Sequence, residues 1–153
     1  MTSHEIHLRE AIALGRANIA EGGTPYGAVI VHEGKVIARA ANQVHATNDP
    51  TAHAESVALR EAGRVLGRPK LEDCVGYASG RPCPMCHAAM RLAGIGEAYF
   101  AFTAEQAAEH GAGNAALYGE LCRPLEEQPM RVRHLLIADE PAPYAEWAGS
   151  KKR

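Results

Sequence analysis

Two short motifs, thirty residues apart, constrain how this 153-residue chain can fold. The first is His53-Ala54-Glu55, and the second is Pro82-Cys83-Pro84-Met85-Cys86. One imidazole and two thiols form a ligand set that suits Zn²⁺. A fold that uses these side chains as ligands must bring the two motifs together.

Helical and strand-like segments alternate along the chain. Apolar positions at helical spacing predict the helices, and short β-rich runs predict the strands. The expected helices are residues 4–20, 51–66, 83–92, 103–110 and 114–121. The expected strands are residues 26–32, 35–41, 74–79, 98–102 and 132–138. Because a Gly-containing turn joins the first two strands as a hairpin, we expect an α/β domain with helices on both faces of a five-stranded mixed sheet.

The length and composition are those of one globular domain. Hydrophobic residues make up 46% of the chain and charged residues 22%, which is ordinary for such a domain. We therefore expect residues 1–153 to form a single domain, with residues 141–153 as a C-terminal tail. The first residues do not resemble an export signal, and no apolar run approaches the roughly 20 residues of a membrane helix, so we expect a cytoplasmic protein without a membrane partner.

The formal net charge is −2 and the sequence pI is about 6.4. Proteins that bind nucleic acids usually carry a basic surplus. The charge therefore argues against a large RNA or DNA substrate and favours a small molecule.

Both motifs fall where a helix is expected to begin. Thr51 is the expected N-cap of the helix that contains His53, and Cys83 and Cys86 lie in the first turn of the next helix. The positive end of a helix dipole lowers a thiol pKa and favours the thiolate that zinc requires. Because the cysteines are three residues apart, one helical turn can direct both sulfurs to the same ion.

Three protein ligands leave one coordination position for water, whose pKa zinc lowers to about 7. Glu55 lies two residues after His53 and is placed to carry protons for that water. Attack on an electron-poor C–NH₂ carbon of a purine or pyrimidine would then give the oxo heterocycle and ammonia. The sequence thus predicts about one Zn²⁺ per chain and a hydrolytic deamination.

Each motif taken alone has other interpretations. A histidine at a helix start is commonly a cap or a surface residue, and a Cys-x-x-Cys pair can be a redox pair or half of a structural zinc site. Residues 83–87 also fit the haem c attachment pattern, which normally requires export and leaves the first motif unexplained. The two motifs together favour catalytic zinc.

The chain resembles the cytidine deaminase superfamily, and more particularly its guanine deaminase-like branch. The similarity extends over nearly the whole length and includes the zinc-deaminase signature H-x-E followed by P-C-x-x-C. It is carried by residues 25–31, Asn42, residues 48–55, residues 71–74, residues 82–86 and residues 143–147. The resemblance implies a three-layer α/β/α sandwich, with His53, Cys83 and Cys86 as zinc ligands and Glu55 as the proton shuttle.

The resemblance also implies a substrate pocket and a partner. Asn42 and the Ala54 backbone would meet the base, and Tyr26 would help to wall the pocket. Guanine deaminase-like proteins are homodimers in which the C-terminal segment crosses to the partner's site. Tyr144 and Trp147 would then be interface or pocket residues, and the alternative for both is packing of a terminal helix.

The chain departs from that branch near the motifs. Arg81 stands where the family commonly has an acidic residue, and Ala112-Gly113-Asn114 replaces a loop that often offers aromatic and acidic groups. A carboxylate can accept two hydrogen bonds from the N1–H and 2-amino edge of guanine, whereas the Asn114 amide offers that edge one carbonyl. Substrate choice is therefore expected to depend on these residues.

Three hypotheses follow. The first is a zinc aminohydrolase of a small aminated heterocycle, with guanine as first choice and cytosine, cytidine, pterins and aminotriazines as alternatives. The second is a tRNA adenosine deaminase, which needs a basic footprint. The third is a zinc-stabilised binding protein without catalysis, although the presence of Glu55 argues against it.

Overall fold

The computed structural model describes residues 1–151. The chain divides into two units, Met1–Cys122 and Arg123–Arg153. The strands are β1 (Gly27–His32), β2 (Lys35–Ala41), β3 (Cys74–Gly80) and β4 (Glu97–Phe102). The helices of the first unit are α1 (Ser3–Ala20), α2 (Val44–Thr47), α3 (Ala54–Leu66), α4 (Pro84–Leu92), α5 (Ala104–Ala108) and α6 (Ala115–Leu121).

The four strands form one mixed sheet in the order β2-β1-β3-β4. β1 is antiparallel to both β2 and β3, whereas β3 is parallel to β4. In this register Gly27 pairs with Ala41, and Gly80 pairs with Phe102. The beginning of β1 and the ends of β2, β3 and β4 therefore lie at the same end of the sheet.

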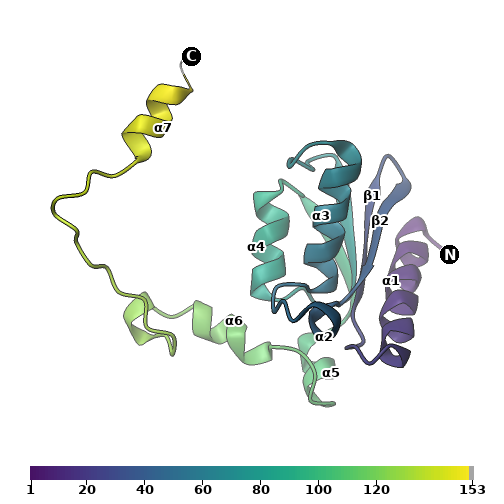
Figure 1. The fold of residues 1–153 in the computed structure, drawn as a ribbon. Helices are drawn as coiled ribbons and strands as arrows, with labels where there is room; N and C mark the ends of the chain where they lie inside the picture. Colours follow the sequence, from purple (N-terminus) through teal and green to yellow (C-terminus); the bar gives the residue numbers. More distant parts are fainter. Residues whose placement is uncertain (152–153) are drawn as a thin grey trace. The chain divides into compact units, whose positions relative to one another are not determined.

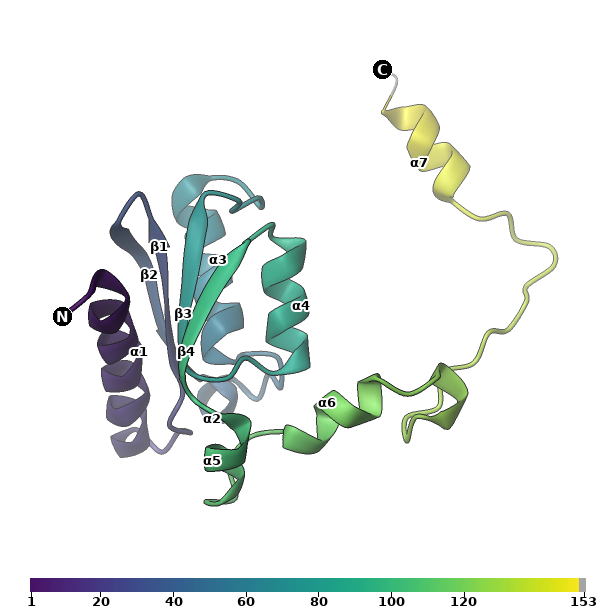
Figure 2. The same cartoon turned by 180° about the vertical axis from the view of Figure 1, so that it is seen from behind.

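Helices cover both faces of the sheet. Helix α1 packs on one face, and α3 and α4 pack on the other (Figure 1), as the view from behind also shows (Figure 2). Alternate residues of β1 face the two layers, because successive side chains of a strand point to opposite faces. Val29 and Val31 pack with Tyr77 in the cluster that includes residues of α1, and Ala28 and Ile30 pack in the cluster that includes residues of α3 and α4. The predicted three-layer α/β/α sandwich is confirmed.

Two glycines let α1 approach the sheet closely. A Cβ atom at Gly27 would lie 2.2 Å from the carbonyl oxygen of Ala11, and one at Gly15 would lie 2.6 Å from that of Pro25. Any larger side chain would push α1 away from the beginning of β1. This contact holds the segment that leads into β1 against α1.

The predicted fifth strand is wrong, because residues 132–138 form no strand. Its apolar side chains are exposed, with Leu135 at 80% and Leu136 at 74%. A β-rich sequence becomes a strand only when a neighbour pairs with its backbone N–H and C=O groups. Within residues 1–151 no strand does so, and the sheet has four strands.

The Arg123–Arg153 unit contains a short 3₁₀ turn, η1 (Leu125–Glu127), and the helix α7 (Tyr144–Ser150). None of its described side chains is buried, so they form no hydrophobic core of their own. Among residues 1–151, no helix combines the length and the apolar character needed to cross a membrane.

Candidate active site

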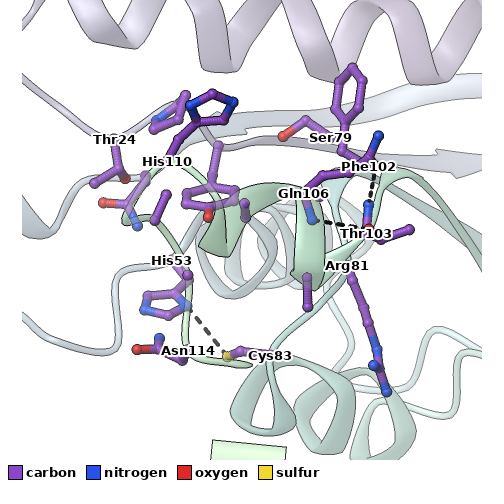
Figure 3. Close-up of a pocket in the computed structure, with 18 of the residues that line it drawn as sticks. Thr24, His53, Ser79, Arg81, Cys83, Phe102, Thr103, Gln106, His110 and Asn114 are labelled. Carbon is purple, nitrogen blue, oxygen red and sulfur yellow. Dashed lines mark hydrogen bonds between the residues drawn. The ribbon is translucent and has the colours of Figure 1, made fainter. Parts of the chain in front are cut away.

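A cavity of about 750 Å³ opens at the end of the sheet where the strand termini gather. Tyr26 precedes β1, Asn42 follows β2, Arg81 follows β3 and Thr103 follows β4, and all four line the cavity. Figure 3 shows the lining side chains, including Arg81 and Thr103. The strand order therefore brings together residues that are far apart in the sequence.

The three candidate zinc ligands come from two helix starts. His53 is the N-cap of α3, Cys83 is the N-cap of α4, and Cys86 lies in the first turn of α4. Their ligand atoms all lie within 4.8 Å of one another. His53 Nδ1 is 3.5 Å from Cys83 Sγ (Figure 3). Tetrahedral zinc, with bonds of about 2.3 Å to sulfur and about 2.1 Å to nitrogen, places such atoms about 3.6 Å apart, so the group fits zinc.

The start of α3 differs from the prediction. The helix begins at Ala54 with His53 as its N-cap, so the expected N-cap at Thr51 is wrong. Thr51 instead donates through its backbone N–H and its hydroxyl to Asp49 Oδ1, at 2.8 and 2.7 Å. The Asp49 side chain thus draws Thr51 into a turn before the helix, which leaves His53 next to the first α3 amides.

The candidate ligands shift one another's pKa values. The Cys86 thiol donates to Cys83, which lowers the pKa of Cys83, and the His53 imidazole lowers it further. The same hydrogen bond and burial raise the pKa of Cys86. Hydrogen bonding to Cys83 raises the pKa of His53. Since zinc binds thiolates, the ion would displace the remaining thiol proton.

Glu55 lies in the first turn of α3 and is only 7% exposed. Burial is the main reason why its pKa is raised, and the charge of Cys83 adds to the effect. A carboxyl with a raised pKa holds a proton more readily than an exposed carboxyl does, which suits a group that must take up and release protons.

The Asn42 side chain is held in one orientation. Its Oδ1 accepts a hydrogen bond of 3.1 Å from the backbone N–H of Val44, and its backbone oxygen accepts one from Asn18 Nδ2. No protein acceptor within residues 1–151 takes the N–H groups of its own amide nitrogen. Ala54, fully buried at the first position of α3, has a backbone N–H without an intrahelical partner. Both residues can therefore donate to a ligand.

The Tyr26 hydroxyl is buried and has no hydrogen-bond partner in the described part of the chain. Burial, followed by the charge of Glu55, raises its pKa, so the group stays protonated. Gly113 has φ +83°, and a Cβ atom there would lie 3.2 Å from the hydroxyl oxygen. The turn between α5 and α6 thus passes directly over the Tyr26 hydroxyl.

The remaining candidates fall in different units. Asn114 lines the cavity, and its side chain makes no cap hydrogen bond to α6. Tyr144 and Trp147 belong to α7 and are 75% and 60% exposed. The Lys151 ammonium lies 3.6 Å from the centre of the Trp147 ring. The pocket or interface roles of Tyr144 and Trp147 stay predictions.

The sequence did not indicate several lining residues. Ser79 is buried, and its hydroxyl accepts a hydrogen bond of 3.0 Å from the Gly27 backbone N–H. Arg16 on α1 and Tyr118 on α6 also face the cavity. None of these residues belongs to a motif, and only their positions in the fold reveal them.

Comparison with known proteins agrees with this geometry. Residues 1–102 match the family described as the cytidine and deoxycytidylate deaminase zinc-binding region. The guanine deaminase of Bacillus subtilis (strain 168) is 38% identical over 146 residues, which cover 95% of this chain and 94% of that protein. An X-ray structure of guanine deaminase from Bacillus subtilis matches with a TM-score of 0.90 at 38% identity, over 97% of this chain and 95% of that one. The tRNA-specific adenosine deaminase of Aquifex aeolicus (strain VF5) is 41% identical over 96 residues, which cover 63% of this chain and 64% of that protein.

Proposed function

Because the chain belongs to the cytidine and deoxycytidylate deaminase family, we propose that this zinc-dependent deaminase acts on a small, free, aminated heterocycle, with guanine as the first candidate. The observation that carries the proposal is a buried carboxyl, Glu55, in the same cavity as His53 and Cys83, two members of a ligand set that fits zinc. Similarity to a guanine deaminase over 95% of the chain supports a guanine-like nucleobase.

The reaction adds water to a C–NH₂ carbon and releases ammonia. His53, Cys83 and Cys86 would hold the zinc ion, which, when bound, would lower the pKa of the attacking water toward about 7. Glu55 would take one proton from this water and deliver it to the ring nitrogen. It would then take the second proton from the added hydroxyl and deliver it to the leaving amine, which departs as ammonia. Its buried position keeps bulk water from competing for these protons.

The cavity offers guanine both donors and acceptors. The Asn42 amide and the Ala54 backbone N–H can donate to the carbonyl and ring-nitrogen acceptors of the base. The Asn114 carbonyl can accept one hydrogen bond from the N1–H and 2-amino edge. We assign these three residues, with Tyr26, to substrate binding.

An ammonia-release screen tests the proposal. Zinc-loaded protein is assayed with purines, cytosine, cytidine, pterins and aminotriazines, and Glu55→Gln serves as the matched control because the amide keeps the size of the side chain. We expect ammonia from guanine, and a fall of about 10²–10⁴-fold in the variant, with about one zinc still bound per chain. Zinc-loaded protein that releases ammonia from none of these compounds would refute the proposal.

The proposed assembly is a homodimer of one-domain chains that exchange their C-terminal segments. Two exposed apolar surfaces support it. Phe100 and Phe102 on β4 are 44% and 46% exposed, and the Arg123–Arg153 unit exposes apolar side chains along its length. These are Leu125, Met130, Val132, Leu135, Leu136, Ile137, Tyr144 and Trp147. Apolar surface of this extent usually marks an interaction site.

Mixing two inactive variants tests the exchange. Glu55→Gln lacks the proton carrier, and Trp147→Ala lacks the residue that is proposed to reach the partner's pocket. In a mixed dimer one site would contain both native residues, so mixing the proteins should restore ammonia release. No recovery, in a sample that light scattering shows to contain mixed dimers, would place Trp147 in its own chain's site or outside both sites.

A tRNA adenosine deaminase is the second candidate, because a tRNA-specific relative is 41% identical over 96 residues. Such an enzyme would bind tRNA with a steep salt dependence and form inosine. The net charge of −2 makes the small molecule the first candidate. The cytoplasmic location stays a prediction.

A further inference from the structure

One wall of the cavity has little burial to hold it in place. This wall is the α5–α6 segment, defined here as residues 103–121, and it includes Gly113 and Asn114. No side chain of α5 or α6 is buried. The turn between the helices contains two glycines with positive φ, Gly111 and Gly113. Since apolar burial is the main source of packing stability, the position of this wall must depend on a few specific contacts.

Tyr118 makes one of these contacts. Its hydroxyl donates a hydrogen bond to the carbonyl oxygen of Pro82. Within residues 1–151 no other side-chain hydrogen bond joins the α5–α6 segment to the rest of the chain. Pro82 directly precedes Cys83, whose sulfur is 3.5 Å from His53 Nδ1. The hydroxyl therefore holds the wall to the backbone immediately before a candidate zinc ligand.

Arg81 fixes the same tyrosine from another direction. Its Cζ atom lies 4.0 Å from the centre of the Tyr118 ring, a favourable cation–π distance. The Arg81 backbone N–H donates to the carbonyl oxygen of Phe102 at 2.9 Å, which ties this residue to the end of β4. No carboxylate of the described chain forms an ion pair with the Arg81 guanidinium, so no ion pair competes with its contact to the Tyr118 ring.

We propose that Tyr118 is a positioning residue, which holds the α5–α6 segment against Pro82, directly before the candidate ligand Cys83, and that Arg81 fixes the Tyr118 ring. The family match ends at residue 102, so this contact joins a part of the chain beyond the matched region to the zinc motif. The inference rests on the proposed function, because the wall that Tyr118 holds carries Asn114, a proposed substrate-binding residue. Its main effect is on substrate affinity, since the ligands and Glu55 lie on other elements.

Tyr118→Phe removes only the hydroxyl, and Tyr77→Phe is the matched control. The Tyr77 hydroxyl also makes one contact, 2.8 Å from His4 Nδ1, and Tyr77 is not among the residues that line the cavity. In zinc-loaded protein without substrate, Tyr118→Phe should speed amide hydrogen exchange in residues 103–121 about fivefold, the effect of one lost hydrogen bond. KM should rise about fivefold while kcat stays within about twofold. Tyr77→Phe should change neither quantity.

Arg81 variants test the second half of the proposal. Arg81→Gln removes the cation and should change exchange and KM in the same direction as Tyr118→Phe, by about two- to threefold. Arg81→Lys keeps the charge and should recover part of that loss. Equal values for Arg81→Gln and the wild type would remove Arg81 from the mechanism.

Unchanged exchange of residues 103–121 in Tyr118→Phe would overturn the proposal, as would an equal change in Tyr77→Phe. A rise in exchange with an unchanged KM would overturn the link to substrate binding. If the wild type releases no ammonia from any heterocycle, the proposed function fails, and the exchange measurement alone still decides whether Tyr118 holds the wall.

Discussion

Tyr26→Phe should raise the stability of the protein and lower its activity. The Tyr26 hydroxyl is buried and has no partner within residues 1–151. Leaving a buried hydroxyl unsatisfied costs about 1–3 kcal/mol. Phenylalanine keeps the ring that walls the cavity and removes this cost. We therefore expect the free energy of unfolding to rise by at least about 1 kcal/mol, which for a chain of this size raises Tm by about 2–4 °C.

The same substitution at Tyr77 should have the opposite sign. The Tyr77 hydroxyl lies 2.8 Å from His4 Nδ1, so Tyr77→Phe loses a hydrogen bond and leaves the imidazole nitrogen without its partner. The free energy of unfolding should fall by about 1 kcal/mol. Thermal and urea unfolding of both variants should be measured with the same zinc occupancy. Both variants lose one hydroxyl oxygen, so a difference in sign between their stability changes reports whether that hydroxyl had a hydrogen-bond partner.

Activity completes this test. If the Tyr26 hydroxyl donates to the bound heterocycle, Tyr26→Phe should lower kcat/KM for ammonia release about tenfold, which corresponds to about 1.4 kcal/mol. A fall in stability like that of Tyr77→Phe would show that the hydroxyl has a partner in the free protein. A gain in stability without loss of activity would show that the hydroxyl does not meet the substrate. Either result refutes the reasoning.

Three further predictions concern the metal, the packing of α1 and a surface ion pair. Removing zinc with a chelator should abolish ammonia release and lower Tm, and free Zn²⁺ at 100 times its Kd should restore about 2.7 kcal/mol of stability, as calorimetry can measure. Gly27→Ala should destabilise the protein by about 1–3 kcal/mol or more in urea unfolding, because the new Cβ would lie 2.2 Å from the carbonyl oxygen of Ala11. Hydrogen bonds from Arg68, and then from His32, lower the pKa of Asp73 to about 2. The pKa of an aspartate in the unfolded chain is about 3.9. The ionised Asp73 carboxylate therefore stabilises the fold above about pH 4, and this stabilisation is lost as the pH falls toward 2. The difference in urea midpoint between the wild type and Asp73→Asn should therefore shrink over that range, and a constant difference would contradict the assignment.

Local patterns predicted the elements of the sheet that have partners. The hairpin and β3 appear where the β-rich runs and the turn residues placed them, within one residue at their ends. The same reasoning failed at residues 132–138, because a β-rich composition indicates only that a segment could form a strand. The N-cap prediction at Thr51 also failed, because the Asp49 side chain forms a local turn there and the helix begins three residues later, at Ala54.

The candidate zinc site was largely predictable, because its chemistry is encoded in short stretches of sequence. His53 and Glu55 lie two residues apart, and Cys83 and Cys86 lie three residues apart, so the local backbone at each helix start sets most of their geometry. The meeting of the two stretches required only that both helices pack on the same face of the sheet, which they do.

The sequence by itself determined the reaction class, because ligand identity and helix-start spacing are local properties. Only the tertiary structure decided which residues line the cavity. Arg81 stacks on Tyr118, and Gly113 covers Tyr26, across separations of more than thirty residues. Contacts over such distances depend on strand order and on the path of α5 and α6, and no periodicity or motif in the chain specifies them.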